Sequence, residues 1–327
     1  MKNIKIVIAG GTGFIGNAIT KYFGNDNEIV ILTRSLKNRE NNSYGKTSMD
    51  NALQKKVRLV QWNAKDTGGW CKEIDGSDLV INLAGKSVNC RYNEKNKQEI
   101  FNSRTNAAKA IGKAISSATV PPKLWINAAS ATIYRNATDR PQDEYTGEFH
   151  NDFSVQVCKL WEKTFFEQRT PFTRKVALRM AITLGDGGVM VPYLNLCKFA
   201  LGGKQGSGKQ MYSWVHVEDV CRTIDFMWQH KELEGAFNVS SPNPVNNETF
   251  MRILRKVTGH KIGLPAFEWM LNIGTGIIGT ETELLLKSRW VLPAKLLESG
   301  FSFKFPNLQT AFEEIINKLP RKAYHLF

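Results

Sequence analysis

The sequence contains few cysteines, and none of them has a spacing that binds metal. Five cysteines are scattered over 327 residues, and no two of them form a CxxC pair. This scarcity excludes a disulfide-stapled scaffold and a zinc module, and it favours reduced thiols in an intracellular protein. We therefore predict no metal site.

Long apolar runs are also missing. No segment reaches the roughly 18 apolar residues that a membrane span needs, because the longest candidate, residues 269–280, is interrupted by three glycines. We recognise no secretory or transit peptide before the first predicted strand. The expected location is the cytoplasm, with the nucleus as the alternative, and no membrane partner is expected.

Acidic residues are in short supply relative to basic ones. Lysine and arginine number 44 against 30 acidic residues, which gives a formal net charge of +14. Such an excess is typical of enzymes for phosphate-bearing ligands and of nucleic-acid binders. The excess is spread out, with some concentration in residues 37–58, and it forms no basic helix. We therefore expect no specific nucleic-acid partner.

The first sixteen residues carry the clearest positive signal. The apolar run 4–9 leads into a glycine cluster, and a helix-compatible segment, residues 17–23, follows. This order is typical of a dinucleotide-binding unit, in which glycines form the turn, admit the pyrophosphate and let the helix pack on the strand. The helix N-terminus offers free N–H groups to phosphates. The alternative is a glycine-rich turn without a ligand. The predicted cofactor contacts are Gly10, Thr12, Gly13, Phe14, Ile15 and Gly16.

Strand and helix patterns alternate through the first half of the chain. The predicted strands are residues 5–9, 29–33, 57–62, 79–83, 124–128 and 174–179, with helices between them, notably 98–117 and 153–168. Alternation of this kind predicts an α/β fold with a Rossmann-like, doubly wound parallel sheet. Loop signals thicken after residue 180. We predict a cofactor-binding domain over residues 1–180, and mainly a smaller C-terminal α+β substrate lid over residues 181–327.

The residue that follows the second predicted strand distinguishes NAD from NADP. NAD enzymes place an acidic side chain there, which accepts from the ribose 2′-hydroxyl. This chain has Thr33, Arg34 and Ser35, and no acidic residue lies between Ile29 and Arg39. A guanidinium suits a 2′-phosphate because it can donate two parallel hydrogen bonds. The pattern favours NADP(H), the alternative being that Arg34 is an ordinary surface residue.

Four motifs in order resemble the extended short-chain dehydrogenase/reductase superfamily. They are GGTGFIG at 10–16, NLAG at 82–85, SAT-x-Y at 130–134 and HVEDV at 216–220. Later segments are similar to an atypical, epimerase-like family within it. Those segments are residues 103–106, the glycine loop 202–208, residues 214–219 and the stretch 291–308. The resemblance covers essentially the whole chain, and a family-specific segment spans about residues 262–315.

The resemblance implies an NADP(H)-dependent oxidoreductase or epimerase acting on a small molecule. By position, Thr33 and Arg34 would bind the adenosine end of the cofactor. Residues 83–84, Leu83 and Ala84, would line the cofactor at the end of the fourth strand. Glu99 and Arg104 would approach it from the following helix. A solvated helix face remains the alternative for Glu99.

The resemblance also implies a catalytic Ser, Tyr and Lys. Ser130 stands in the serine position, whereas the superfamily spacing puts Val155 in the tyrosine position and Lys159 in the lysine position. Valine cannot exchange a proton. Tyr134 is a candidate substitute, with a packing role as its alternative. Lys159 is a candidate for the nicotinamide ribose, with a helix-surface role as its alternative. The predicted catalytic residues are thus Ser130, Lys159 and Tyr134.

Two functions follow from this altered pattern. The first is an oxidoreductase or epimerase with an unconventional proton donor, its pocket lined by Ser130, Tyr134, Arg179 and the loop 185–193. The second is a non-catalytic NADP(H)-binding redox sensor or scaffold, which the missing tyrosine favours. In either case, His216 and Asp219 of the HVEDV motif are interpreted as structural residues that join sheet and lid.

Overall fold

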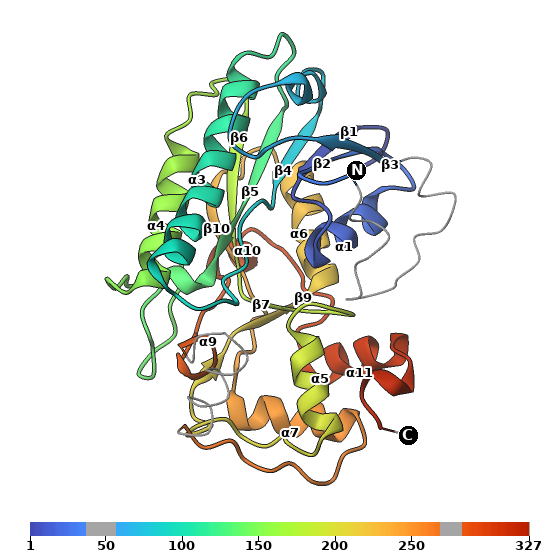
Figure 1. Ribbon diagram of the computed structural model, residues 1–327, viewed down its shortest axis with the longest axis vertical. Coiled ribbons are helices and arrows are strands. Elements are labelled where there is room, and N and C mark those ends of the chain that lie inside the picture. The colour runs from blue at the N-terminus through green and yellow to red at the C-terminus, as the bar shows by residue number, and fades with distance from the viewer. Residues whose placement is uncertain (37–56, 269–282, 327) are drawn as a thin grey trace.

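A seven-stranded parallel sheet forms the centre of the molecule (Figure 1). The computed structural model describes residues 1–36, 57–268 and 283–326, so most of the basic stretch 37–58 and the apolar stretch 269–280 lie outside the described residues. The strands are β1 (Lys5–Ala9), β2 (Glu28–Thr33), β3 (Val57–Gln61), β4 (Leu79–Asn82), β5 (Leu124–Ser130), β6 (Arg174–Met180) and β10 (Gly235–Val239). Their order is β10-β6-β5-β4-β1-β2-β3. The Rossmann-like fold predicted from the sequence is therefore confirmed.

The strands are apolar on both sides because helices cover both faces of the sheet. In β1, Ile6 and Ile8 face one hydrophobic cluster while Val7 and Ala9 face the other, and all four are fully buried. Burying one such branched side chain stabilises the fold by about 1.5–3 kcal/mol. Ile8 pairs in register with Ile31, so the apolar alternation of neighbouring strands is aligned across the sheet.

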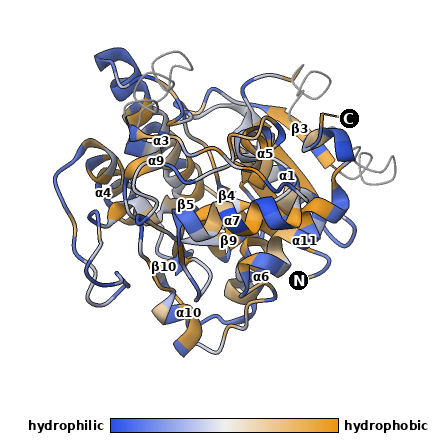
Figure 2. Ribbon diagram, turned by 90° about the horizontal axis from the view of Figure 1, so that it is seen from below, coloured by the Kyte–Doolittle hydropathy of each residue, from blue (hydrophilic) through white to orange (hydrophobic). Residues whose placement is uncertain are grey.

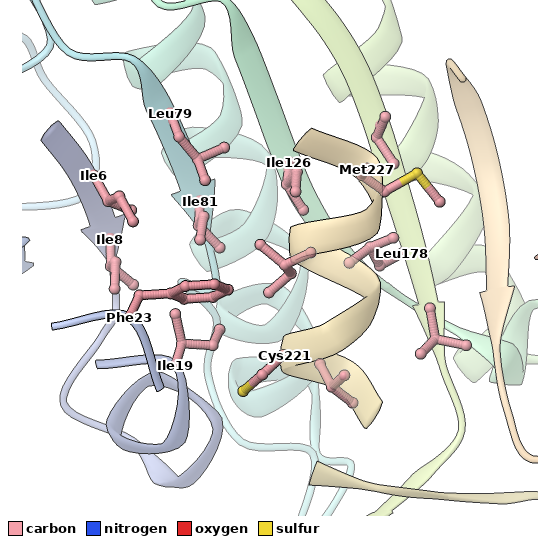
Figure 3. Close-up of a cluster of buried hydrophobic side chains, with 14 of the residues drawn as sticks. Ile6, Ile8, Ile19, Phe23, Leu79, Ile81, Ile126, Leu178, Cys221 and Met227 are labelled. Atoms are coloured by element: carbon pink, nitrogen blue, oxygen red, sulfur yellow. The ribbon is translucent and has the colours of Figure 1, made fainter. Parts of the chain in front are cut away.

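Two pairs of helices form the outer layers (Figure 1). The helices α1 (Phe14–Phe23) and α6 (Val217–Gln229) pack on one face, where Figure 3 shows Ile19, Phe23, Cys221 and Met227 against the strands. The helices α3 (Glu94–Ser116) and α4 (Phe153–Phe166) cover the opposite face. Helix α3 begins four residues before its predicted start, because the Asn93 side chain caps it by accepting the Asn96 N–H.

The lid is built mainly from the second half of the chain and lies below the sheet in Figure 1. It contains α5 (Met190–Lys198), α7 (Asn247–Val257) and α11 (Leu308–Lys318), with the pairs β7 (Ile182–Leu184)–β9 (Trp214–His216) and β8 (Met211–Tyr212)–β11 (Val245–Asn246). Its core includes Tyr193, Phe250 and Phe312. Figure 2 shows the apolar and polar sides of α7 and α11. Short helices complete the chain: η1 (Gly69–Glu73), η2 (Ala131–Ile133), α9 (Glu283–Leu286), α10 (Ala294–Glu298) and η3 (Arg321–Ala323).

The chain does not pass from sheet to lid only once. After β9 it returns to the sheet as α6 and β10, and β10 pairs with β6. The sequence assigns the region 181–327 mainly to the lid. This region also supplies the strand β10, the covering helix α6 and the short helix α10, whose Leu296 packs in the sheet cluster. Among the helices that the structure describes, none is both long and apolar enough to cross a bilayer.

The predicted joint between sheet and lid is confirmed at the start of α6. The ring of His216 caps this helix, since its Nδ1 accepts the Glu218 N–H (3.2 Å) and its Nε2 faces Glu314 Oε2 (3.0 Å). Asp219 is fully buried and accepts the backbone N–H groups of Lys304 and Phe305 at 2.8 and 2.9 Å. Both side chains therefore hold the C-terminal segment against α6.

Changing Gly16 to alanine should destabilise the fold. A Cβ at this position would lie 2.4 Å from the Gly11 carbonyl oxygen, and relieving such overpacking costs about 1–3 kcal/mol. Urea unfolding of Gly16→Ala should show this loss. Gly69→Ala is the matched control, because a Cβ there meets no atom within 4 Å. Equal stability of the two variants would contradict this account of the turn.

The pH dependence of stability should depend on His216. Burial lowers the pKa of this ring below its ordinary 6.5, so the unfolded chain takes up the proton first and stability is lost as pH falls below about 6.5. His216→Asn keeps a capping side chain but removes the titration. Urea unfolding between pH 5 and 8 should therefore show a shallower slope for this variant.

His230 supplies the control for that measurement, since its side chain is 40% exposed, against 2% for His216. His230→Asn reports the general effect of removing one histidine. The unfolding free energy of His216→Asn could instead fall with decreasing pH as steeply as that of the unaltered chain. That result would show that the buried ring does not cause the loss of stability at acidic pH.

Candidate functional site

The glycine turn lies at the point where the strand order reverses. Strands β4 and β5 extend to one side of β1, and β2 and β3 to the other; ligands of such sheets bind outside the carboxyl ends of the strands at this point. Gly10 has a φ of +74°, and a Cβ there would lie 3.0 Å from the Ala84 backbone. Leu83 N–H donates to the Ala9 carbonyl at 2.8 Å. The fold therefore brings Leu83 and Ala84 to the turn, as the sequence predicts.

The start of α1 is open to an incoming phosphate. Gly13 is exposed and caps α1 without any side-chain hydrogen bond, and a Cβ on it would meet only the Gly10 carbonyl oxygen, at 4.0 Å. Thr12 is partly buried, and its carbonyl accepts from Asn17 Nδ2 at 3.4 Å. The first N–H groups of α1 and the dipole of this helix thus face a space that can hold an anion.

Phe14 and Ile15 direct their side chains away from this opening. Ile15 packs against the sheet cluster. Phe14 packs against the lid loop, where a Cβ on Gly185 or on Gly188 would come within 2.7 or 2.9 Å of its ring. These two residues therefore offer backbone groups to a ligand, while the Phe14 ring joins the glycine turn to the lid.

The end of β2 presents Arg34 to solvent. The Thr33 hydroxyl accepts the Ser35 N–H (3.3 Å) and donates to the Ser35 carbonyl (3.1 Å), which closes a tight turn around the arginine. Arg34 is exposed, and no carboxylate of the described residues forms an ion pair with it. The guanidinium lies one strand away from the glycine turn and is available to an anionic ligand.

The two residues expected to approach from α3 behave differently. Arg104 packs beside Gly85, because a Cβ added to this glycine would lie only 3.3 Å from Arg104 Cζ. The Arg104 guanidinium donates hydrogen bonds to the carbonyls of Lys86 (3.0 Å) and Ile100 (3.1 Å). Burial lowers the pKa of Arg104. Glu99 is exposed and forms an ion pair with Lys86. The structure thus brings Arg104 to the end of β4 and leaves Glu99 on the helix surface.

The orientation of α4 differs from the expected one. Cys158 is only 5% exposed and packs with Ala131 of the segment that follows Ser130, and the Ser130 hydroxyl interacts with the thiol. Lys159 is exposed, so the structure does not bring it to Ser130. Because each helical residue turns the side chain by about 100°, a difference of one position moves the predicted lysine out of the site.

Ser154 takes the position one turn before Cys158. Its hydroxyl donates to Glu283 Oε1 at 2.7 Å, whereas Val155, the residue expected at the tyrosine position, is fully buried. A sequence signal identifies the face of α4 that carries Cys158. Residues at helical spacing form one stripe, which excludes the two lysines of this helix. The stripe consists of Ser154, Cys158, Trp161 and Phe165, and the excluded residues are Lys159 and Lys163.

The Cys158 thiol stays protonated at neutral pH. Burial raises its pKa to about 12, the Glu162 carboxylate raises it further, and the guanidinium groups of Arg104 and Arg289 act in the opposite direction. Within the described ranges, no three His, Cys, Asp or Glu side chains converge as metal ligands would.

A C-terminal segment that the sequence reasoning did not single out adds charged groups to the site. Lys287 Nζ lies 2.5 Å from Asp152 and 2.8 Å from Glu283. Arg289 Nη2 lies 3.9 Å from Glu283, and Arg289 Nη1 is buried with no hydrogen-bond partner among the described residues. The only sequence signal is a pair of basic residues, Lys287 and Arg289, next to an apolar stretch.

Tyr134 belongs to a buried polar network. Its hydroxyl donates to Asn238 Oδ1 (3.0 Å) and accepts from Arg179 Nη1 (2.8 Å), and Arg179 also forms two hydrogen bonds of 2.8 Å with Glu162. Burial raises the pKa of Tyr134 to about 12. Tyr134 and Arg179 are thus hydrogen-bonded to each other and to internal partners. This arrangement corresponds to a packing role for Tyr134, the alternative to its role as a substitute proton donor.

Tyr134→Phe should reduce stability and leave cofactor affinity unchanged. Removing the hydroxyl leaves a buried Arg179 N–H and the Asn238 carbonyl without this partner, which costs about 1–3 kcal/mol. Urea unfolding and NADPH titration measure the two quantities. Tyr22→Phe is the control, because Tyr22 is exposed. Unchanged stability together with weakened NADPH binding would place Tyr134 in the site instead.

Two family models match this chain. The NAD dependent epimerase/dehydratase family matches residues 6–240, which carry the glycine turn, Ser130, α4 and, from the lid, α5 and the β7–β9 pair. A domain of unknown function, DUF1731, matches residues 266–315, and this stretch includes Lys287 and Arg289.

Relatives of similar length match almost the whole chain. The chain is 31% identical over 314 residues to the epimerase family protein YfhF of Bacillus subtilis, with 96% of this chain and 98% of YfhF covered. It is also 31% identical to the epimerase family protein SSP1921 of Staphylococcus saprophyticus, covering 95% and 99% of the two chains. The crystal structure of the human epimerase family protein SDR39U1 with NADPH is similar in fold, with a TM-score of 0.82, 24% identity and coverage of 97% and 100%. This chain therefore belongs to the NAD dependent epimerase/dehydratase family.

Proposed function

We propose that this protein is an NADP(H)-dependent oxidoreductase or epimerase that acts on a small carbonyl or hydroxyl compound. The observation that carries the proposal is the open N-terminus of α1 at the strand-order reversal, with the exposed Arg34 one strand away. The human relative SDR39U1 was solved with NADPH, which supports the phosphate-bearing cofactor over NAD.

The residues of the crevice fit the parts of such a cofactor. The α1 N–H groups after Gly13 would hold the pyrophosphate, because that space is open and of positive potential. Arg34 would take the 2′-phosphate through its planar fork of donors. Ala84 and Arg104 would lie along the cofactor at the end of β4. The glycines at the turn leave the backbone uncovered where the cofactor must come closest.

The reaction needs a hydride and a proton, and the chain supplies the groups that handle the proton. NADPH, when bound, supplies the hydride that adds to the carbonyl carbon. Ser130 would donate a hydrogen bond to the carbonyl oxygen and hold it in place. The proton that this oxygen takes would come from the Cys158 thiol, which contacts Ser130 and is protonated at neutral pH. The resulting thiolate would lie beside two guanidinium groups and be reprotonated from water.

A second candidate function is favoured by the face that α4 turns to Ser130. This face carries Ser154 and Cys158, and neither a tyrosine hydroxyl nor a lysine ammonium. A non-catalytic NADP(H)-binding sensor or scaffold would retain the glycine turn and Arg34, and would bind the cofactor without passing its hydride to a carbonyl.

Titration with NADPH and NADH tests the cofactor assignment. Nicotinamide fluorescence should show tight NADPH binding and weak NADH binding. Arg34→Ala should weaken NADPH binding about tenfold to a hundredfold, because charged hydrogen bonds to the 2′-phosphate are lost, and should leave NADH binding unchanged. Arg169→Ala is the matched control, since Arg169 is exposed in the turn between α4 and β6.

Two outcomes would contradict the proposal. Binding of neither nucleotide would remove the cofactor altogether, and equal weakening of both by Arg34→Ala would show that Arg34 does not read the 2′-phosphate. With binding established, NADPH oxidation followed by absorbance with a panel of small carbonyl compounds separates the enzyme from the sensor.

A further inference from the structure

The backbone around Arg289 is held from two sides. Arg289 N–H donates to the Met211 carbonyl (2.7 Å), and its own carbonyl accepts the Ser213 N–H (2.9 Å), both from the lid. On the other side, Ser288 N–H donates to Asn136 Oδ1 at 2.7 Å. Segment 288–292 thus crosses between the lid and the loop after β5, and it carries the Arg289 side chain inward.

The two carboxylates at this crossing lie closer to Lys287 than to either neighbouring guanidinium. Asp152 and Glu283 are both within 2.8 Å of Lys287, whereas the nearest approach of Arg289 to Glu283 is 3.9 Å. Arg104 has no carboxylate partner among the described residues. The described cluster therefore contains three cations and two anions, and the excess positive charge falls on the arginines.

The side chain of Arg289 also has an unused donor. Its Nη1 atom is buried and without a hydrogen-bond partner among the described residues, and a guanidinium is charged at neutral pH wherever it lies. Buried donors are rarely left unpaired in folded proteins, and a buried unpaired charge is costlier still. An anionic group that enters with a ligand would satisfy both requirements.

We propose that Arg289 binds a carboxylate of the substrate, so that the substrate is a small oxo acid or hydroxy acid. This inference rests on the proposed function and names the substrate class for the same site. Val291, two residues after Arg289, packs with Cys158 and with Ala131, the neighbour of Ser130. Glu283, which lies 3.9 Å from Arg289, accepts a hydrogen bond from Ser154, one turn before Cys158. A substrate whose carbonyl oxygen is held by Ser130 and whose anion is held by Arg289 must therefore carry the two groups within a few bonds of each other.

Alkylation of Cys158 measures this arrangement without knowledge of the natural substrate. Iodoacetate carries its carboxylate on the carbon that the Cys158 sulfur attacks, and iodoacetamide is its neutral counterpart. In either case the Cys158 thiol gives up its proton to solvent, its sulfur forms a bond to carbon and iodide leaves, so the reaction is run at alkaline pH. The full chain, with and without NADPH, would be treated with each reagent, and the modified peptides quantified by mass spectrometry.

We expect the rate ratio of iodoacetate to iodoacetamide to be about tenfold higher at Cys158 than at Cys71, reflecting one charged hydrogen bond to the carboxylate. Cys71 is a partly exposed thiol in η1, away from this cluster. Arg289→Gln should reduce the ratio at Cys158 to that of Cys71, whereas Arg289→Lys, which keeps the charge, should retain a preference. Arg169→Gln should leave the ratio unchanged.

Competition identifies the anion. Pyruvate should slow the iodoacetate reaction at Cys158, and inorganic phosphate at the same concentration should not. The proposal is overturned if Cys158 reacts with neither reagent, if its ratio equals that of Cys71, if the preference survives in Arg289→Gln, or if phosphate protects and pyruvate does not. NADPH titration is read separately, so failure of the cofactor assignment is distinguishable from failure of the carboxylate site.

Discussion

The close approach of backbone to backbone at the glycine turn is the constraint on which the rest of the structure depends. A side chain on Gly10 would collide with Ala84, and one on Gly16 would collide with the Gly11 carbonyl. Without these contacts, α1 could not begin directly over the end of β1, and β4 could not end beside it. The same absence of side chains leaves the α1 N-terminus exposed, so one packing requirement produces both the sheet crossover and the anion-binding opening.

A second contact connects this turn to the lid. The Phe14 ring fits against Gly185 and Gly188, where no larger residue leaves room for it. From that point the chain forms the lid, returns through α6 to the sheet, and crosses the site again as segment 288–292. Hydrogen bonds to Met211, Ser213 and Asn136 hold this last crossing in place, and the buried Asp219 holds residues 304–305 that follow it. The cofactor crevice and the C-terminal segment are therefore coupled through packing.

The chemistry that we propose for the site differs from the Tyr and Lys chemistry that the sequence resemblance implies. Cys158 of α4 packs with Ala131, the residue after Ser130, and Ser154 donates to Glu283. Arg289 comes from a segment about 130 residues later. A thiol of raised pKa beside guanidinium groups is suited to giving up a proton only when negative charge develops next to it. Arg104 and Arg289 would then stabilise the sulfur after the proton has left.

The sequence by itself determined the sheet, its helical layers and the glycine turn, because these follow from local signals: apolar alternation, glycine spacing and the residues that end each strand. It also pointed to Arg34, which follows the end of β2, and to Ser130, the last residue of β5. The tertiary structure alone decided which face of α4 meets Ser130, since a shift of one residue rotates a helix by about 100°. It likewise decided that Tyr134 bonds to Arg179 and Asn238 and that Arg289 reaches the site, because these contacts join residues far apart in the chain and depend on how the lid packs.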